Sequence, residues 1–214
     1  MNPYYEDEWV TLYHGDCLQI TDWLAADVLV TDPPYGIDYS RGEWAKQRGK
    51  NNCSEGIAND TTTDARDAAL ALWGTRPALV FGSDRAPRPS GVKWPLIFEK
   101  PTVACGLVGR RGPWLSNWEF IFACGDWPDQ TPTNGSVYKT RALASSGYSG
   151  YATKAGHPHA KPLDVLEALI VTCPPGTIAD PFAGSGSTLV AAKALGRKAI
   201  GVELEERYCE IAAR

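Results

Sequence analysis

A rigid turn that carries a carboxylate and an aromatic ring follows an apolar run near residue 30. Leu29-Val30-Thr31 leads directly into Asp32-Pro33-Pro34-Tyr35. Proline fixes its own φ angle and lacks a backbone N–H, so the turn is stiff and its carbonyls remain as acceptors. An exocyclic amino group of a nucleobase has two N–H donors, which the Asp32 carboxylate and the Pro33 carbonyl can accept. Tyr35 can stack on the base, a contact worth about 1–3 kcal/mol.

The same turn suits chemistry at that amine. The amine lone pair of adenine or cytosine is delocalised into the ring, which makes the nitrogen a poor nucleophile. Two fixed acceptors favour a pyramidal nitrogen and stabilise the positive charge that develops when it attacks a methyl group. Asp32, Pro33 and Tyr35 are therefore the candidate catalytic residues. A Pro-Pro pair alone also suits an ordinary strand exit, and the complete tetrapeptide favours the base pocket.

A glycine-rich segment is the second candidate site. Asp180-Pro181-Phe182-Ala183-Gly184-Ser185-Gly186-Ser187-Thr188 lies between an expected strand and an expected helix. Glycines permit a tight turn and a close approach to a ligand, and the amides of a helix start favour anionic groups. Glu203 ends the next expected strand, where an acid can accept hydrogen bonds from ribose hydroxyls. The pattern favours a nucleoside cofactor over a turn without a ligand. A nicotinamide cofactor usually requires a third glycine, and Leu189 occupies that position.

Alternating apolar runs and helical patterns must position these two segments. Together they predict an α/β three-layer sandwich with a largely parallel sheet. The expected strands are Val10–His14, Asp27–Thr31, Ala78–Gly82, Leu96–Glu99, Glu119–Ala123, Thr177–Asp180 and Lys198–Val202. The expected helices are Cys17–Ala25, Asp64–Trp73, Pro162–Thr172, Ser187–Leu195 and Glu205–Ala213. Residues 36–63 are polar and rich in Gly, Asn and Thr, and we expect a mobile loop there.

The charge is distributed unevenly along the chain. The formal net charge of −4 alone argues against a nucleic-acid partner. Residues 1–32 contain seven acids and no Lys or Arg, whereas residues 33–161 contain sixteen bases and eleven acids, a balance of +5. The densest basic stretch follows the Asp32 turn directly, so it could reach phosphates beside a bound base. It consists of Arg41, Lys46, Arg48 and Lys50.

Composition excludes several other classes of protein. A hydrophobic fraction of 43% excludes a disordered chain, and no run of 18 apolar residues predicts a membrane span. The polar N-terminus does not resemble a secretory leader, so we expect a cytoplasmic protein. The six cysteines form no Cys-x-x-Cys pair and are expected to be mostly buried thiols. His157 and His159 have no further ligands at suitable spacing, so no metal site is expected.

The two motifs together resemble those of S-adenosylmethionine-dependent amino-group DNA methyltransferases, the N6-adenine and N4-cytosine family. The Asp32-Pro33-Pro34-Tyr35 motif precedes the glycine-rich segment, an order that resembles the β group of these enzymes. Tyr13-His14-Gly15-Asp16-Cys17 resembles the family's opening strand, and the segment 157–163 resembles the entry to the helix before the cofactor loop. Phe98-Glu99-Lys100-Pro101 and Asn117-Trp118-Glu119 resemble the strands near its base pocket. The resemblance covers nearly the whole chain.

The resemblance implies the fold and the ligand sites. It implies a single catalytic domain over 1–214, with a seven-stranded sheet that has one antiparallel strand and a circularly permuted motif order. Asp16 would lie by the cofactor adenine, and Lys161 would pair with the cofactor carboxylate. The expected cofactor-binding residues are Asp16, Lys161, Asp180, Phe182, Ala183, Gly184, Ser185, Gly186, Ser187 and Glu203. Residues 125–156 would form a short target-recognition insertion that adds Lys139 and Arg141 to the DNA-binding residues; because it is short, either recognition is loose or a homodimer shares it.

The activity implied is methyl transfer from S-adenosylmethionine to the N6 amine of adenine in double-stranded DNA. The target base would flip out of the duplex, and transfer would be direct and in line. N4 methylation of cytosine is the nearest alternative, and Asp rather than Ser at position 32 favours adenine. An RNA methyltransferase, a catalytically silent DNA-binding module and a nicotinamide oxidoreductase are further alternatives.

Overall fold

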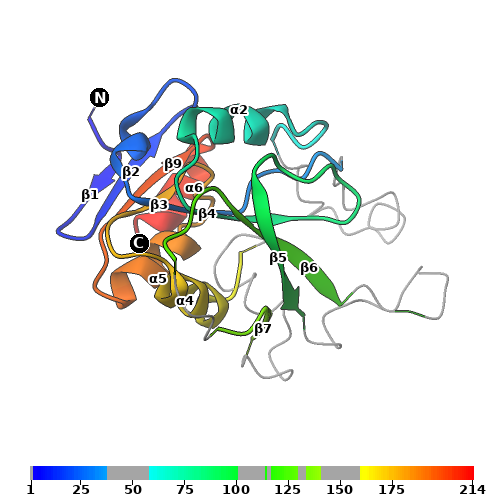
Figure 1. Cartoon of the computed structure of the whole chain (residues 1–214). Coiled ribbons are helices and arrows are strands. Elements are labelled where there is room, and N and C mark those ends of the chain that lie inside the picture. Colours follow the sequence, from blue (N-terminus) through cyan, green and yellow to red (C-terminus); the bar gives the residue numbers. More distant parts are fainter. Residues whose placement is uncertain (1, 38–57, 101–113, 115–116, 130–133, 141–159) are drawn as a thin grey trace, which may run out of the picture.

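The computed structural model describes residues 2–37, 58–100, 114, 117–129, 134–140 and 160–214. These residues form one nine-stranded sheet in the order β1-β2-β9-β8-β3-β4-β6-β5-β7 (Figure 1). The strands are β1 (Tyr5–Glu6), β2 (Val10–His14), β3 (Val28–Thr31), β4 (Ala78–Gly82), β5 (Val92–Glu99), β6 (Trp118–Cys124), β7 (Val137–Lys139), β8 (Ile178–Asp180) and β9 (Ala199–Glu203).

Most of the sheet is parallel. Strands β2, β9, β8, β3 and β4 run in the same direction as successive neighbours. Strand β6 is antiparallel to both β4 and β5, β7 is parallel to β5, and β1 is antiparallel to β2. The sequence pattern predicts seven strands, and the resemblance implies that one of them is antiparallel, whereas the described residues form nine strands, two of them antiparallel. The additional strands, β1 and β7, contain two and three residues, and such short edge segments carry no readable periodicity.

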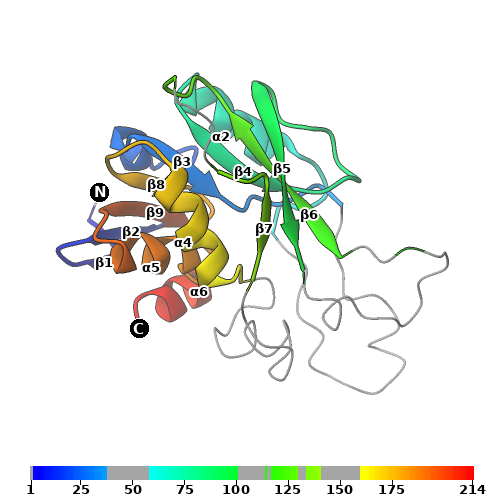
Figure 2. The ribbon, with the colours of Figure 1, turned by 60° about the horizontal axis from the view of Figure 1, so that its bottom comes forward.

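Helices cover both faces of the sheet, as the three-layer prediction requires. They are α2 (Asp64–Trp73), α4 (Leu163–Thr172), α5 (Ser187–Ala194) and α6 (Glu206–Ala212), with the 3₁₀ helix η1 (Asp22–Ala25). Helices α4, α5 and α6 pack into one buried cluster, and η1 and α2 pack into another. Figures 1 and 2 show these two groups on opposite sides of the strands. In β3, Leu29 faces the second cluster while Val28 and Val30 face the first, which explains its continuous apolar run.

Two elements differ from the sequence prediction. The expected helix Cys17–Ala25 is wrong, because only the one-turn η1 forms. The Asp16 carboxylate accepts the Leu18 N–H at 2.9 Å and the Trp23 indole donates to the Cys17 carbonyl at 2.9 Å, so local hydrogen bonds replace a helix there. Strand β5 begins four residues earlier than expected and includes Pro95. Among the described residues Pro95 pairs only with β6, so it occupies the outer edge, where proline is tolerated.

The parallel strands place the two candidate motifs at one edge. Because parallel strands end on the same side, the residues after β2, β3, β8 and β9 meet there. The antiparallel β6 begins at that same edge, since Phe120 pairs with Gly82, the last residue of β4. Of the helices in the described part of the chain, none is long and apolar enough to span a bilayer.

Candidate active site

The turn Asp32-Pro33-Pro34-Tyr35 and the glycine-rich segment are neighbours in space. Strand β3 ends at Thr31 and β8 ends at Asp180, and these two strands pair directly. The Thr31 hydroxyl donates to Asp180 Oδ1 at 2.7 Å, in a buried position. Two segments about 150 residues apart are thus joined at the point where each leaves the sheet, as the sequence analysis requires of one combined site.

The glycine-rich segment forms the connection from β8 to α5. Gly184 and Gly186 have φ angles of 52° and 80°, which favour glycine. A Cβ on Gly186 would lie 2.8 Å from the Ala212 side chain, so close packing against α6 also requires glycine. The expected cofactor residues Phe182, Ala183, Gly184, Ser185, Gly186 and Ser187 therefore all lie in this one turn and the start of α5.

Glu203 stabilises that turn from the end of β9. Its Oε2 accepts the Gly184 N–H at 2.7 Å and its Oε1 accepts the Glu205 N–H at 2.7 Å. Burial raises the pKa of its carboxyl, although these amide hydrogen bonds oppose the effect. Each carboxylate oxygen has a second lone pair, so a ribose hydroxyl can still bind. The ribose role stays a prediction.

Asp16 lies beside Glu203 across the β2–β9 pair. His14 and Glu203 are paired in register, and the Gly15 N–H donates to the Glu203 carbonyl at 2.8 Å. Asp16 therefore stands at the same edge as the glycine-rich turn. Two carboxylates on adjacent strand ends suit the hydroxyl and amino donors of a nucleoside.

Asp180 connects the two motifs and is fully enclosed. Its Oδ1 also accepts the Phe182 N–H at 3.1 Å. Burial raises the pKa of the Asp180 carboxyl to about 6, against the hydrogen bonds from Thr31, Thr188 and Phe182 that lower it. Its role in the described residues is to fix the path of the chain out of β8.

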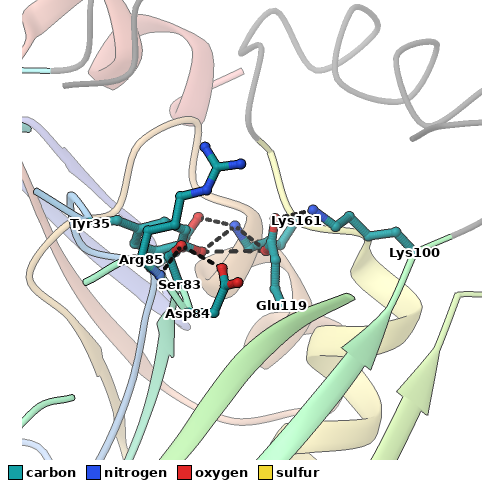
Figure 3. A network of polar contacts seen from close by, with 8 residues as sticks. Tyr35, Ser83, Asp84, Arg85, Lys100, Glu119 and Lys161 are labelled. Atoms are coloured by element: carbon teal, nitrogen blue, oxygen red, sulfur yellow. Dashed lines mark hydrogen bonds and ion pairs between the residues drawn. The ribbon is translucent and has the colours of Figure 1, made fainter. Parts of the chain in front are cut away.

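A charged network surrounds the Asp32 turn. Tyr35 donates to Asp32 Oδ1 at 2.8 Å, and Lys161 Nζ donates to Asp32 Oδ2 at 2.6 Å. The Lys161 ammonium also lies 3.4 Å from Glu119 Oε2, and Lys100 Nζ lies 2.8 Å from Glu119 Oε1. Figure 3 shows Tyr35, Glu119 and Lys161 pointing toward one another, with Lys100 on the far side of Glu119. Two carboxylates and two ammonium groups thus alternate from Asp32 to Lys100.

Burial and charge set the protonation states of this network. Burial would raise the pKa of Glu119, but Lys161 and Lys100 outweigh it and hold the pKa at about 2. Burial, followed by the charges of Asp32 and Glu119, raises the pKa of Tyr35 well above its usual value. At neutral pH, Glu119 is therefore an anion and Tyr35 is a phenol that donates a proton to a hydrogen bond.

Lys161 contacts the Asp32 turn. Its ammonium contacts Asp32 and Glu119 of the charged network described above. Its pairing with a cofactor carboxylate stays a prediction. The resemblance implies only that the segments containing Lys100 and Glu119 lie near the base pocket, and the pairing of Glu119 with Lys100 and Lys161 comes from the structure. The sequence feature that could have indicated Glu119 is an acid within the apolar run of β6. In the sheet Glu119 is paired in register with the buried Phe98 of β5.

The predicted DNA-binding residues are mostly outside the described part of the chain. The residues outside it are Arg41, Lys46, Arg48, Lys50 and Arg141. Residues 38–57 of the expected loop 36–63 also lie outside it. The described ends of that loop are joined, since the buried Asp60 accepts the Gly36 N–H at 2.8 Å. Lys139 lies on β7 and pairs with Glu99 at 2.8 Å. Within the described residues, no group of three or more His, Cys, Asp or Glu side chains could hold a metal ion.

The fold and the two motifs define an α/β domain in which the glycine-rich turn lies beside the Asp32-Pro33-Pro34-Tyr35 turn at one edge of the sheet. A family model for DNA methylases of the N6 and N4 type matches residues 72–214, more than half of the chain. The chain belongs to this DNA methylase family, which confirms the resemblance.

Curated relatives agree along the whole chain. The type II methyltransferase M2.LlaDCHI of Lactococcus lactis subsp. cremoris is 48% identical, with 99% of this chain and 91% of the relative covered. The type II methyltransferase M.ScaI of Streptomyces caespitosus is 27% identical, with 98% and 82% covered.

Solved structures share the fold. The crystal structure of an M1.HpyAVI–SAM complex has a TM-score of 0.59 and 23% identity, with 95% of this chain and 98% of that chain covered. The PvuII cytosine-N4-specific DNA methyltransferase has a TM-score of 0.66 and 16% identity, with 99% and 88% covered.

Proposed function

We propose that this DNA methylase transfers a methyl group from S-adenosylmethionine to the N6 amine of adenine in DNA. The observation that carries the proposal is the direct connection between the two motifs, in which the Thr31 hydroxyl before the catalytic turn binds Asp180 of the glycine-rich segment at 2.7 Å. A methyl donor bound by that segment and a base bound by that turn would be neighbours.

The residues at the carboxyl edge suit the proposed cofactor. The carboxylates of Asp16 and Glu203 can accept hydrogen bonds from its adenosine hydroxyl and amino groups, and the turn around Gly184 permits close approach. S-adenosylmethionine supplies an electrophilic methyl group on a sulfonium. The M1.HpyAVI structure, a SAM complex with the same fold, supports this choice.

The Asp32 turn would orient the amine of the target. A base inside a duplex is out of reach, so it must flip out at a cost of a few kcal/mol. Asp32 and the Pro33 carbonyl accept hydrogen bonds from the two N–H groups of the amine and stabilise the positive charge that develops on the nitrogen, while Tyr35 contacts the base. The N–C bond forms as the C–S bond breaks, and the amine then releases a proton to water. Orientation and charge stabilisation account for the protein's contribution.

Adenine is the proposed target because position 32 is Asp. Cytosine is the second candidate, since the family includes both N6 and N4 enzymes and the PvuII enzyme of the same fold is N4-specific. Both amines present the same N–H donors to Asp32, so the choice of adenine rests on the resemblance, in which Asp rather than Ser at this position favours N6 methylation.

One experiment separates these candidates. The protein is incubated with unmethylated DNA and methyl-labelled S-adenosylmethionine, and the DNA is digested to nucleosides. Label in N6-methyl-2′-deoxyadenosine supports the proposal, and label in N4-methyl-2′-deoxycytidine reassigns the target to cytosine. Label in neither, with label in a parallel RNA sample, would make the protein an RNA methyltransferase.

Several finer statements belong to the same proposal. Arg41, Lys46, Arg48, Lys50, Lys139 and Arg141 contact DNA phosphates, and residues 125–156 contribute to target recognition. The motif order is a circular permutation, which the pairing of β2 with β9 supports because it brings the two ends of the catalytic sequence together. A homodimer and a cytoplasmic location are further expectations.

A further inference from the structure

Both oxygens of the Asp32 carboxylate already have a donor in the protein alone. Tyr35 donates to Oδ1 at 2.8 Å, and the Lys161 ammonium donates to Oδ2 at 2.6 Å. The proposed function requires Asp32 to accept an N–H from the amine of the target base. An ammonium and an exocyclic amine are both N–H donors, so Lys161 and the target compete for the same carboxylate.

If the Lys161 ammonium leaves Asp32, it loses its shortest contact and keeps the Tyr35 hydroxyl at 3.2 Å and the Glu119 carboxylate at 3.4 Å. Its side chain is only 7% exposed, and it lies between aromatic rings, with Nζ 5.0 Å from the Phe81 centroid and 5.5 Å from the Tyr35 centroid. A buried ammonium is unfavourable unless a carboxylate at hydrogen-bond distance compensates for its lost hydration. Simple displacement by a base would therefore be unfavourable.

Glu119 is the carboxylate within reach. Its Oε2 lies 3.4 Å from Lys161 Nζ, so a movement of ~0.6 Å would bring the two to the distance of a strong charge-assisted hydrogen bond. Its other oxygen is held by Lys100 at 2.8 Å, and Oε2 faces both the Lys161 ammonium and the Tyr35 hydroxyl, each at 3.4 Å. Lys161 and Lys100 keep the pKa of Glu119 low despite its burial, so Glu119 is available as an anion.

We propose that the Lys161 ammonium occupies the place of the target amine at Asp32 in the free protein, and that Glu119 is a positioning residue that receives this ammonium when the base enters. The inference rests on the proposed function and adds a step to it. The ammonium moves from one carboxylate to the other, the target amine replaces it at Oδ2, and no covalent bond or proton changes place.

The test is a pair of variants measured with saturating cofactor in single turnovers. Glu119→Gln removes the receiving charge and leaves the ammonium on Asp32, so we expect about a tenfold or greater fall in transfer, through weaker productive DNA binding. Adding Lys161→Met to Glu119→Gln removes the competitor and should restore transfer several-fold above Glu119→Gln alone. Glu119→Asp keeps the charge and should lose less activity than Glu119→Gln.

Three measurements keep a structural role apart from the proposed one. The affinity for S-adenosylmethionine and the thermal midpoint should change little in Glu119→Gln. The matched control is Asp67→Asn, which removes a half-exposed carboxylate paired with Arg66 on α2, away from the charged network and the proposed DNA-binding residues, and should retain activity. If Lys161→Met deepens the loss of Glu119→Gln or leaves it unchanged, the exchange is wrong. Absence of transfer by the wild-type protein would remove the proposed function together with this inference, whereas wild-type transfer without the rescue would remove the inference alone.

Discussion

The hydroxyl of Thr31 donates a buried 2.7 Å hydrogen bond to the carboxylate of Asp180. Thr31 comes immediately before the proposed catalytic turn, and Asp180 opens the glycine-rich segment, so one short contact joins the two halves of the candidate site. Any shift of β8 against β3 would move a bound methyl donor relative to a bound base.

Replacement of Thr31 by valine removes this donor and keeps the side-chain shape. The buried Asp180 carboxylate would lose one of its hydrogen bonds, so we expect a loss of about 1–3 kcal/mol in the free energy of unfolding. Urea denaturation at pH 7.5 measures it. Thr11→Val, a half-buried threonine on β2, is the control, and an equal loss in both variants would contradict the assigned importance of the Thr31 contact.

Asp32→Ala tests the catalytic turn. Without the carboxylate the target amine loses an acceptor and its developing charge loses stabilisation, so single-turnover methyl transfer should fall by about 10²-fold or more. Isothermal calorimetry should show an affinity for S-adenosylmethionine close to that of the wild type, because the glycine-rich turn is unchanged. Near-normal turnover by this variant would defeat the proposed mechanism.

Glu203→Ala tests the cofactor side. The variant loses the hydrogen bonds to the proposed ribose and leaves the Gly184 and Glu205 N–H groups without their carboxylate. We expect the affinity for S-adenosylmethionine to fall about tenfold, equivalent to about 1.4 kcal/mol. Calorimetry measures this, and saturating cofactor should recover most of the transfer rate. An unchanged dissociation constant would remove Glu203 from the cofactor site.

The pKa of Asp180 predicts a dependence of stability on pH. An acid whose pKa is raised from 3.8 to about 6 on folding binds its proton more tightly in the folded state. Its contribution to stability is therefore most favourable below its unfolded pKa and is lost as pH rises through about 6, by a total of about 1–3 kcal/mol. Asp180→Asn removes this titration, so the stability of the variant relative to the wild type should improve between pH 4.5 and 7.5. A difference that stays constant with pH would contradict the assignment.

The basic stretch after the catalytic turn is testable by charge reversal. Lys46→Glu with Arg48→Glu should weaken DNA binding. The loss of two phosphate contacts should also reduce the steepness of the plot of log affinity against log salt by about 2. Fluorescence anisotropy with duplex DNA at several salt concentrations measures both quantities. Lys198→Glu with Arg214→Glu reverses the same charge on exposed residues outside the candidate site and serves as control. Equal salt slopes in the two double variants would exclude the proposed phosphate contacts.

The sequence was most informative where periodicity and backbone chemistry are local. The apolar run before Asp32 and the glycines after Asp180 are sufficient to predict both turns, because strand burial and positive φ angles have local signatures. The first half of β5 was not predicted because it contains Pro95. Proline fits a strand at a sheet edge, and whether Pro95 lies at an edge depends on which strands pair with β5. The pairing of Lys161 with Asp32 spans 129 residues and depends on where α4 begins relative to β3, which no local pattern encodes.

The contacts of Glu119 are a second feature that the local sequence does not predict. An acid within an apolar strand is visible in the sequence, but its two lysine partners come from the end of β5 and from the segment before α4. They converge only because β6 runs antiparallel to its neighbours and so begins where the others end. Strand direction in a mixed sheet is a property of the whole topology and is not encoded by the residues of one strand.

The strand order has a consequence for how the chain acquires its structure. Strand β3 pairs with β8, in which Ile178 stands 150 positions after Val28, and β2 pairs with β9 at a still larger separation. Such distant contacts slow folding, since loop closure must precede the stabilisation they provide. On the ribosome, β3 would have only β4 beside it until residues 178–203 emerge. We therefore expect the apolar edge of β3 to be the surface that a chaperone protects during synthesis.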